Sequence, residues 1–214
     1  MRAVRAVVFD FNGTLSDDEP LMFEIYRGLF AQHGRPLTRE QYFSELAGHS
    51  EEAIIGGWLG VEGAELDALV AERISRYQTL AADGSTVPDR ARAVVRYAAQ
   101  RAPVGLVSGA FRAEIEPVLA AAGIADCFRF LVTADDVARS KPAADPYTKA
   151  LARLGTGDPA EVVAIEDTEA GVVSAKAAGL RCVALLGTHP RERLAAADQI
   201  ADRLDLELLR RLLP

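Results

Sequence analysis

The 214 residues include 31 acidic and 24 basic side chains, which gives a formal net charge of −7, and half of the residues are hydrophobic. This composition is typical of a globular protein and excludes a disordered or fibrous chain. The acidic balance argues against nucleic acid as a partner, and an anionic substrate would need local positive charge. We recognise neither a signal peptide nor a membrane-spanning run, and Cys127 and Cys182 form no disulfide framework. We therefore expect a cytoplasmic protein without membrane attachment.

Five short apolar runs predict buried strands, and alanine-rich helical stretches precede the last four of them. Asp145 is predicted to cap the third of these helices, while Gly123 and Gly179 are predicted to follow the ends of the second and fourth. This alternation predicts an α/β fold with a doubly wound parallel sheet. The strands are predicted at residues 6–10, 104–108, 130–133, 162–166 and 182–186, and the helices at 91–100, 113–122, 146–154 and 171–178.

One long segment interrupts the alternation and shows helical patterns alone. A helix is predicted to begin at Pro20, and another at the capping box that Thr38 and Gln41 form. A further amphipathic helix is predicted from its apolar stripe: Leu66, Val70 and Ile74. We therefore predict an inserted helical domain. The two parts are a Rossmann-like core of residues 1–17 and 85–214 and a helical cap of residues 18–84.

Side chains suited to metal and phosphate chemistry stand where the predicted strands end. Ligands of a doubly wound sheet bind beyond the carboxyl ends of its strands. Carboxylates beside a lysine and free backbone N–H groups suit a hard cation such as Mg²⁺ that bridges to a phosphate. The groups in question are Asp10-Phe11-Asn12-Gly13-Thr14, Ser108-Gly109, Glu166-Asp167 and, before the fourth strand, Ser140-Lys141-Pro142.

In this order, the segments resemble the four motifs of the haloacid dehalogenase superfamily. The helical insert after the first motif resembles the branch that contains phosphoglycolate phosphatase and β-phosphoglucomutase. The resemblance covers essentially the whole chain. It implies an Mg²⁺-dependent phosphatase that hydrolyses a small phosphomonoester, such as a sugar phosphate, and acts as a monomer or weak homodimer. It implies no nucleic-acid or membrane partner.

The resemblance also implies how the first and last motifs would act. Asp10 would be the nucleophile that attacks phosphorus and forms an aspartyl-phosphate. Mg²⁺ would be held by Asp10, by the backbone carbonyl of Asn12 and by Asp167, with Glu166 in or next to this ligand set. The cation would screen the negative charge that otherwise keeps a carboxylate away from a phosphoryl group.

The two middle motifs are implied to hold the phosphoryl oxygens. Ser108 and Lys141 would contact these oxygens directly, and Lys141 would also offset the carboxylate cluster. Backbone N–H groups of the turns at Gly13 and Gly109 would add donors for the anion. The positive charge that the acidic chain needs is thus available locally.

Asn12 departs from the family pattern, because phosphatases and phosphomutases carry an aspartate there that transfers a proton to and from substrate oxygens. Asparagine can form hydrogen bonds in this place, but it cannot transfer a proton at neutral pH. Three alternatives stay open. Asn12 is natural and turnover is slow or differently assisted, or it was introduced to trap an intermediate, or the protein binds phosphate compounds without hydrolysing them.

Other activities of the superfamily fit this sequence less well. β-Phosphoglucomutases have a histidine and an arginine as specificity groups where this chain has Met22 and Glu51. Dehalogenases lack the second aspartate but need no Mg²⁺, so they leave the pair of Glu166 and Asp167 unexplained. We rank the phosphatase first, and the alternative from another class is a binding or regulatory homologue disabled by Asn12.

The remaining polar and aromatic residues are expected to have structural roles. Asp17, Asp18 and Glu19 are expected to cap the first helix of the insert. Arg73 and Arg76 are expected on a solvated helix face, and His49 on a turn of the cap. The aromatic residues of the insert are expected to pack in its core: Phe23, Tyr26, Phe30 and Trp58.

Overall fold

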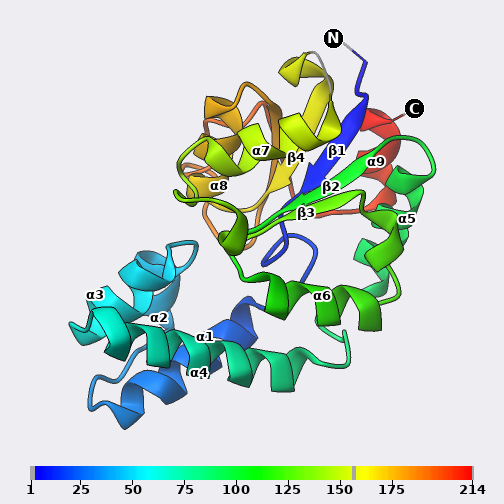
Figure 1. Cartoon of the computed structure of the whole chain (residues 1–214). Helices are drawn as coiled ribbons and strands as arrows, with labels where there is room; N and C mark the ends of the chain where they lie inside the picture. Colours follow the sequence, from blue (N-terminus) through cyan, green and yellow to red (C-terminus); the bar gives the residue numbers. More distant parts are fainter. Residues whose placement is uncertain (1–2, 156–157, 214) are drawn as a thin grey trace.

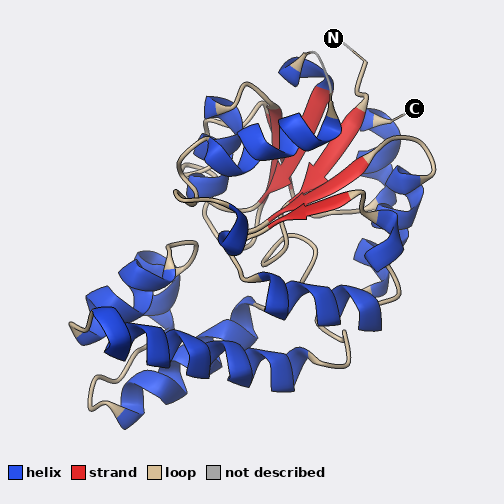
Figure 2. Ribbon diagram, viewed as in Figure 1, coloured by secondary structure: helices blue, strands red, loops and turns tan. Residues whose placement is uncertain are grey.

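The computed structural model describes residues 3–155 and 158–213. Within these ranges the chain forms an α/β fold around a six-stranded parallel sheet, with strand order β3-β2-β1-β4-β5-β6 (Figures 1 and 2). The predicted fold class is confirmed. The strands are β1 (Ala6–Phe9), β2 (Val104–Val107), β3 (Phe130–Val132), β4 (Val162–Glu166), β5 (Arg181–Leu185) and β6 (Gln199–Ala201).

The central strand β1 is buried at every residue, as expected for a parallel sheet that helices cover on both faces. Its register pairs Val7 with Val104 of β2 on one side and Val8 with Ala164 of β4 on the other. All five predicted strands are confirmed to within one residue at each end. The strand β6 is not predicted by the sequence, because this edge strand is only three residues long and partly exposed, so it has no apolar run.

Two helical layers cover the sheet. One face packs against α5 (Asp89–Ala99), α6 (Arg112–Ala121) and α9 (Leu206–Leu212), and the other against α7 (Asp145–Leu154) and α8 (Glu169–Ala177). Gly123 and Gly179 follow helix ends with positive φ, as predicted. The predicted cap of α7 was wrong: Ala144 is the N-cap, and Asp145 is the first helical residue, whose carboxylate pairs with Arg139.

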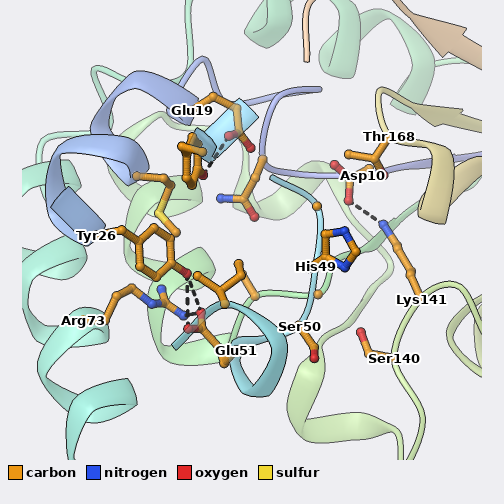
Figure 3. A pocket seen from close by; sticks show the side chains of 17 residues that line it. Asp10, Glu19, Tyr26, His49, Ser50, Glu51, Arg73, Ser140, Lys141 and Thr168 are labelled. Carbon is orange, nitrogen blue, oxygen red and sulfur yellow. Dashed lines mark hydrogen bonds and ion pairs between the residues drawn. The ribbon is translucent and has the colours of Figure 1, made fainter. Parts of the chain in front are cut away.

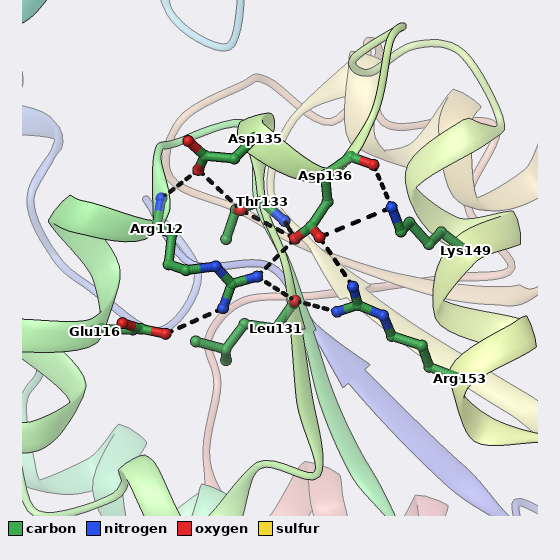
Figure 4. Close-up of polar contacts among 8 residues, drawn as sticks. All are labelled: Arg112, Glu116, Leu131, Thr133, Asp135, Asp136, Lys149 and Arg153. Carbon is green, nitrogen blue, oxygen red and sulfur yellow. Dashed lines mark hydrogen bonds and ion pairs between the residues drawn. The ribbon is translucent and has the colours of Figure 1, made fainter.

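A polar network joins α6 and α7 across the end of β3 (Figure 4). The carboxylate of Asp136 accepts hydrogen bonds from Arg112 of α6 and Arg153 of α7, at 2.7 and 2.9 Å, and from the backbone of Thr133. Although burial acts to raise the pKa of Asp136, these hydrogen bonds and the charge of Arg153 lower it to about 2. The network fixes the loop that leads toward Lys141.

The helical insert lies beside the sheet in Figure 1 and has an apolar cluster of its own. The predicted packing of its aromatic residues is confirmed, since Phe30 stacks on Trp58 and contacts Tyr26. The capping box of Thr38 and Gln41 is also confirmed. The helical segments are α1 (Glu19–Gln32), α2 (Arg39–Gln41), the π-helical turns Tyr42–Leu46 and Glu52–Gly56, α3 (Gly57–Leu59) and α4 (Gly63–Ala81).

The buried stripe of α4 differs from the predicted one. Leu66, Val70 and Ile74 are only partly buried, whereas the fully buried positions begin one residue before Val70 and recur every four residues along the helix. The reason is that α4 packs against both α1 and α6, so it buries polar side chains whose partners come from other elements. The buried residues of α4 are Leu69, Arg73, Tyr77 and Ala81.

Asp17, Asp18 and Glu19 do not cap α1 through their side chains, which corrects that prediction. Asp18 occupies the N-cap position, but its buried carboxylate accepts hydrogen bonds from Asn12 and Tyr77 instead. Asp17 pairs with Arg90 at the surface. No helix among the described residues has both the length and the apolar character needed to cross a membrane.

Candidate active site

The four motif segments meet at one edge of the sheet. Asp10 directly follows β1, Ser108 follows β2, and Glu166 ends β4 with Asp167 behind it. Because β1 lies between β2 and β4, these three strand ends are neighbours. Lys141 reaches the same place from the loop before α7, and all five side chains are buried.

Lys141 links two of the carboxylates. Its Nζ lies 2.6 Å from Asp10 Oδ1 and 2.6 Å from Glu166 Oε1, and it also donates to the carbonyl of Val107 at 3.1 Å. Burial acts to lower the pKa of Lys141, but the negative charges of Asp10 and Glu166 outweigh it and raise the pKa above its usual value. Lys141 is therefore a fixed positive charge beside Asp10.

Asp10, Glu166 and Asp167 form a buried acidic cluster in which one carboxylate oxygen of each residue lies within 4.8 Å of the other two. Burial, together with the neighbouring carboxylates, raises the pKa of Glu166 to about 7 and that of Asp167 well above its usual value. Glu166 Oε2 has no hydrogen-bond partner. Three carboxylates thus face one ammonium group, and the unpartnered oxygen and excess negative charge fit a hard divalent cation.

Two glycines let the backbone approach these carboxylates closely. A Cβ atom at Gly13 would lie 2.0 Å from Asp167 Oδ2, and one at Gly171 would lie 1.9 Å from Glu166 Oε2. Gly13 also has φ of +71°, which favours glycine. The role of Gly13 is predicted by its sequence motif. The role of Gly171 is not, because its closeness to Glu166 results from the packing of α8 against β4.

Asn12 lies beside the cluster with both ends of its amide engaged. Its Nδ2 donates to Asp18 Oδ2 at 2.9 Å, and its Oδ1 accepts a long hydrogen bond of 3.4 Å from Ser108 Oγ. Burial raises the pKa of Asp18 to about 6, against the effect of the hydrogen bonds from Tyr77 and Asn12. These hydrogen bonds orient the side-chain amide of Asn12, with Oδ1 toward Ser108 and Nδ2 toward Asp18.

A pocket opens between this edge of the core and the helical insert (Figure 3). Figure 3 shows Asp10 and Lys141 on one wall and Tyr26, Glu51 and Arg73 on the opposite wall. The core contributes Asp10, Asn12, Gly109, Ser140, Lys141 and Thr168, and the insert contributes, among others, Glu19, Met22, Tyr26, Tyr42, His49, Glu51 and Arg73.

Arg73 lies in this pocket wall and not on a solvated face, so that prediction was wrong. It is 1% exposed and forms ion pairs with Glu51 of the insert and with Glu114 of α6 in the core. The hydroxyl of Tyr26 donates to Glu51 as well, at 3.0 Å. Arg76 is partly exposed and pairs with Glu72. Arg73 could not be recognised from the sequence because Glu114 lies 41 positions away.

Glu19 is the second carboxylate that the insert places in the pocket. Its Oε2 accepts a hydrogen bond of 2.9 Å from the hydroxyl of Tyr42. Burial, aided by the negative charges of Asp18 and Asp10, raises the pKa of Glu19 to about 7. His49 also lines the pocket and lies toward Asp10 and Lys141 in Figure 3.

The fold and the buried acidic cluster agree with what comparison with known proteins finds. Residues 4–179 match the haloacid dehalogenase-like hydrolase family. This match covers most of the chain, and the protein belongs to that family. The predicted family membership is confirmed.

Several relatives align over nearly the whole chain. Validoxylamine A 7'-phosphate phosphatase of Streptomyces hygroscopicus subsp. limoneus is 33% identical over 91% of both chains. Phosphoglycolate phosphatase of Yersinia pseudotuberculosis is 29% identical over 86% of this chain and 82% of its own length. A CbbY mutant from Rhodobacter sphaeroides, crystallised with xylulose 1,5-bisphosphate, superposes with a TM-score of 0.84 at 26% identity, covering 94% of this chain and 95% of that chain.

Proposed function

We propose that the protein is an Mg²⁺-dependent phosphatase that hydrolyses a small phosphomonoester, a sugar phosphate or similar metabolite, through an aspartyl-phosphate on Asp10. The observation that carries this proposal is the pairing of Asp10 with Lys141 inside a buried acidic cluster that opens into a pocket. The named phosphatases among the relatives, and the sugar bisphosphate bound to CbbY, support the substrate class.

In the proposed first step, Asp10 attacks the phosphorus atom. Lys141 holds Asp10 Oδ1, so Oδ2 is the oxygen that attacks. A bond forms between this oxygen and phosphorus while the bond to the substrate oxygen breaks, and the leaving oxygen takes up a proton from water. Water then attacks phosphorus in a second step, releasing inorganic phosphate and restoring the Asp10 carboxylate. Ser108, Lys141 and the backbone at Gly13 and Gly109 would hold the phosphoryl oxygens through both steps.

The metal would be held by Asp10, Asp167, the backbone carbonyl of Asn12 and the neighbouring Glu166. When bound, Mg²⁺ supplies positive charge that screens the anionic nucleophile from the anionic phosphoryl group. The unpartnered Glu166 Oε2 and the excess of carboxylates over cations support this assignment. Thr14 and Thr188 hold the carboxylate of Asp167 in place by hydrogen bonds, so it is oriented before a cation binds.

Asn12 cannot protonate the leaving oxygen or accept a proton from water. Its N–H donates to Asp18, so this amide acts as a positioning group and turnover is slow. The same observation favours one alternative, a homologue that binds phosphate compounds without hydrolysing them. A phosphomutase is less well supported, because Met22 and Glu51 stand where β-phosphoglucomutases have a histidine and an arginine. A 2-haloacid dehalogenase is less well supported, because it needs no Mg²⁺ and leaves the pair of Glu166 and Asp167 unexplained.

Phosphate release from a panel of metabolite phosphates, with and without Mg²⁺, distinguishes the phosphatase from the binding protein. The phosphatase hypothesis predicts Mg²⁺-dependent release, and Asn12→Asp is expected to raise kcat by about 10²–10⁴-fold, the usual effect of general acid–base catalysis. Mg²⁺-dependent phosphate binding without any turnover would overturn the phosphatase hypothesis in favour of the binding protein.

We further propose that residues 18–84 act as a cap over a core of residues 1–17 and 85–214. The pocket between them and the separate apolar core of the insert support this division. The cap would exclude water from the site and select the substrate. We also propose that the protein acts in the cytoplasm as a monomer or weak homodimer.

A further inference from the structure

The wall of the pocket that the cap contributes is acidic. Glu19 and Glu51 both line it, while Arg73 is the only lysine or arginine among the described cap residues that do so. Arg73 is already held by two carboxylates, Glu51 and Glu114. The group of three therefore carries a net charge of one negative unit, to which Glu19 adds more when it is ionised.

The hydrogen bonds of this wall also have a direction. The hydroxyl of Tyr26 donates to Glu51, and the hydroxyl of Tyr42 donates to Glu19. Once their hydrogens are used in this way, the tyrosine oxygens can only accept. Carboxylates are acceptors as well, so these four side chains offer acceptors to whatever lies against them. A phosphate dianion is itself an acceptor, whereas hydroxyl and ammonium groups are donors.

We propose that the part of the substrate that lies against Glu19 and Glu51 is a hydroxylated group with a protonated amine, and that this wall disfavours a substrate with a second phosphate. The inference rests on the proposed function, because it places the reacting phosphate at Asp10. The substrate class is then a monophosphate of an amino sugar or of a similar polyhydroxylated amine.

Two further observations support the assignment. Lys141 lies on the opposite wall and is engaged by Asp10 and Glu166, so it is not available to a distal phosphate. Glu19 forms no ion pair with a lysine or arginine of the described residues, and burial, together with the negative charges of Asp18 and Asp10, raises its pKa to about 7. An ammonium group on the substrate would supply a cation, whereas a second phosphate would repel both carboxylates.

The test compares three probes that differ at the distal group: glucosamine 6-phosphate, glucose 6-phosphate and glucose 1,6-bisphosphate. We expect kcat/KM for glucosamine 6-phosphate to exceed that for glucose 6-phosphate by about threefold or more. For the bisphosphate we expect a value at least about tenfold below that of glucose 6-phosphate, because like charges facing one another are costly. Any other order of the three values overturns the proposal.

Glu51→Gln tests the charge of the wall. Glutamine can still accept hydrogen bonds from Tyr26 and Arg73, while the net charge of the group formed with Arg73 and Glu114 becomes zero. We expect the preference for the amine to fall toward one and the bisphosphate to gain at least threefold relative to glucose 6-phosphate. Glu45→Gln removes the same charge from an exposed position of the cap outside the pocket and should leave both ratios unchanged. Equal ratios in the wild type and in Glu51→Gln would contradict the proposal, and Glu19→Gln provides a second variant if Glu51→Gln does not fold.

Binding measurements separate a failure of this inference from a failure of the proposed function. If no probe releases phosphate, the proposed function fails, and titration calorimetry of the full chain with the same three probes and Mg²⁺ still tests the inference. Affinities in the order amine, neutral sugar, bisphosphate would support it. Equal affinities, or the tightest binding for the bisphosphate, would overturn it.

Discussion

The two walls of the pocket handle buried charge in different ways. At the core wall, Lys141 pairs with two of the three clustered carboxylates, and the remaining negative charge and one unpartnered oxygen fit a divalent cation. On the cap wall, the cation Arg73 is enclosed by Glu51 and Glu114, so its charge is already neutralised. The core wall is therefore suited to an anion whose charge a bound divalent cation would offset. The cap wall is suited to a donor-rich group.

Arg73→Met tests the cap wall and has the largest expected effect. Removal of the guanidinium would leave Glu51 and Glu114 as buried carboxylates without a cation, which is expected to lower the free energy of unfolding by about 3–5 kcal/mol. Urea denaturation measures this loss. Arg76→Met is the matched control on the same helix, and because Arg76 is partly exposed the expected change is about 0.5 kcal/mol or less. Equal effects of the two variants would contradict the role given to Arg73.

Lys141→Met tests the core wall. Since Lys141 is the positive group that would contact both Asp10 and the transferring phosphoryl group, kcat is expected to fall by about 10²–10³-fold. Steady-state phosphate release measures the change. Lys149→Met serves as the control, because Lys149 lies on α7 and pairs with Asp136 away from the pocket. An unchanged kcat in Lys141→Met would remove this residue from the catalytic group.

Addition of Mg²⁺ tests whether the core wall binds a divalent cation, because such binding would raise the free energy of unfolding. At a Mg²⁺ concentration of about 100 times Kd, the free energy of unfolding is expected to rise by about 2.7 kcal/mol, because the cation binds the folded state alone. Thermal unfolding with Mg²⁺ and with a chelator measures the gain. Asp167→Asn should abolish most of it, whereas Asp198→Asn, at a surface carboxylate that pairs with Lys176, should retain it. A gain that survives in Asp167→Asn would place the metal elsewhere.

The pH dependence of stability tests Glu19 of the cap wall. Burial raises the pKa of Glu19 from its usual 4.5 to about 7 in the folded protein. The folded state therefore binds this proton more tightly than the unfolded state, and stability should fall as the pH rises from 4.5 to about 7. Glu19→Gln should flatten that part of the profile, measured by urea denaturation at several pH values. A profile unchanged by the substitution would contradict the raised pKa.

The core wall could be located from the sequence, whereas the cap wall could not. Parallel strands bring their carboxyl ends to one edge, so Asp10, Ser108 and Glu166 were expected together before any side chain was placed. These three residues lie close together because β1 lies between β2 and β4 in the sheet.

The cap wall depends on packing between distant segments. Arg73 lies on a helix whose pattern of charged residues is typical of a solvated face, and its burial follows from Glu114, which lies on α6 where that helix packs against α4. Asp18 was likewise expected to cap α1, but Asn12 and Tyr77 hold it, and Tyr77 lies 59 positions away. Local periodicity contains no information on such partners.

The covalent state of Asp10 tests the central claim most directly. The protein is mixed with Mg²⁺ and a metabolite that releases phosphate, quenched in acid within one turnover, digested and measured by mass spectrometry. The account predicts a phosphorylated peptide that contains Asp10 in the wild type, and neither this peptide nor phosphate release in Asp10→Asn. Phosphate release without a phosphorylated Asp10, or release that persists in Asp10→Asn, would contradict it.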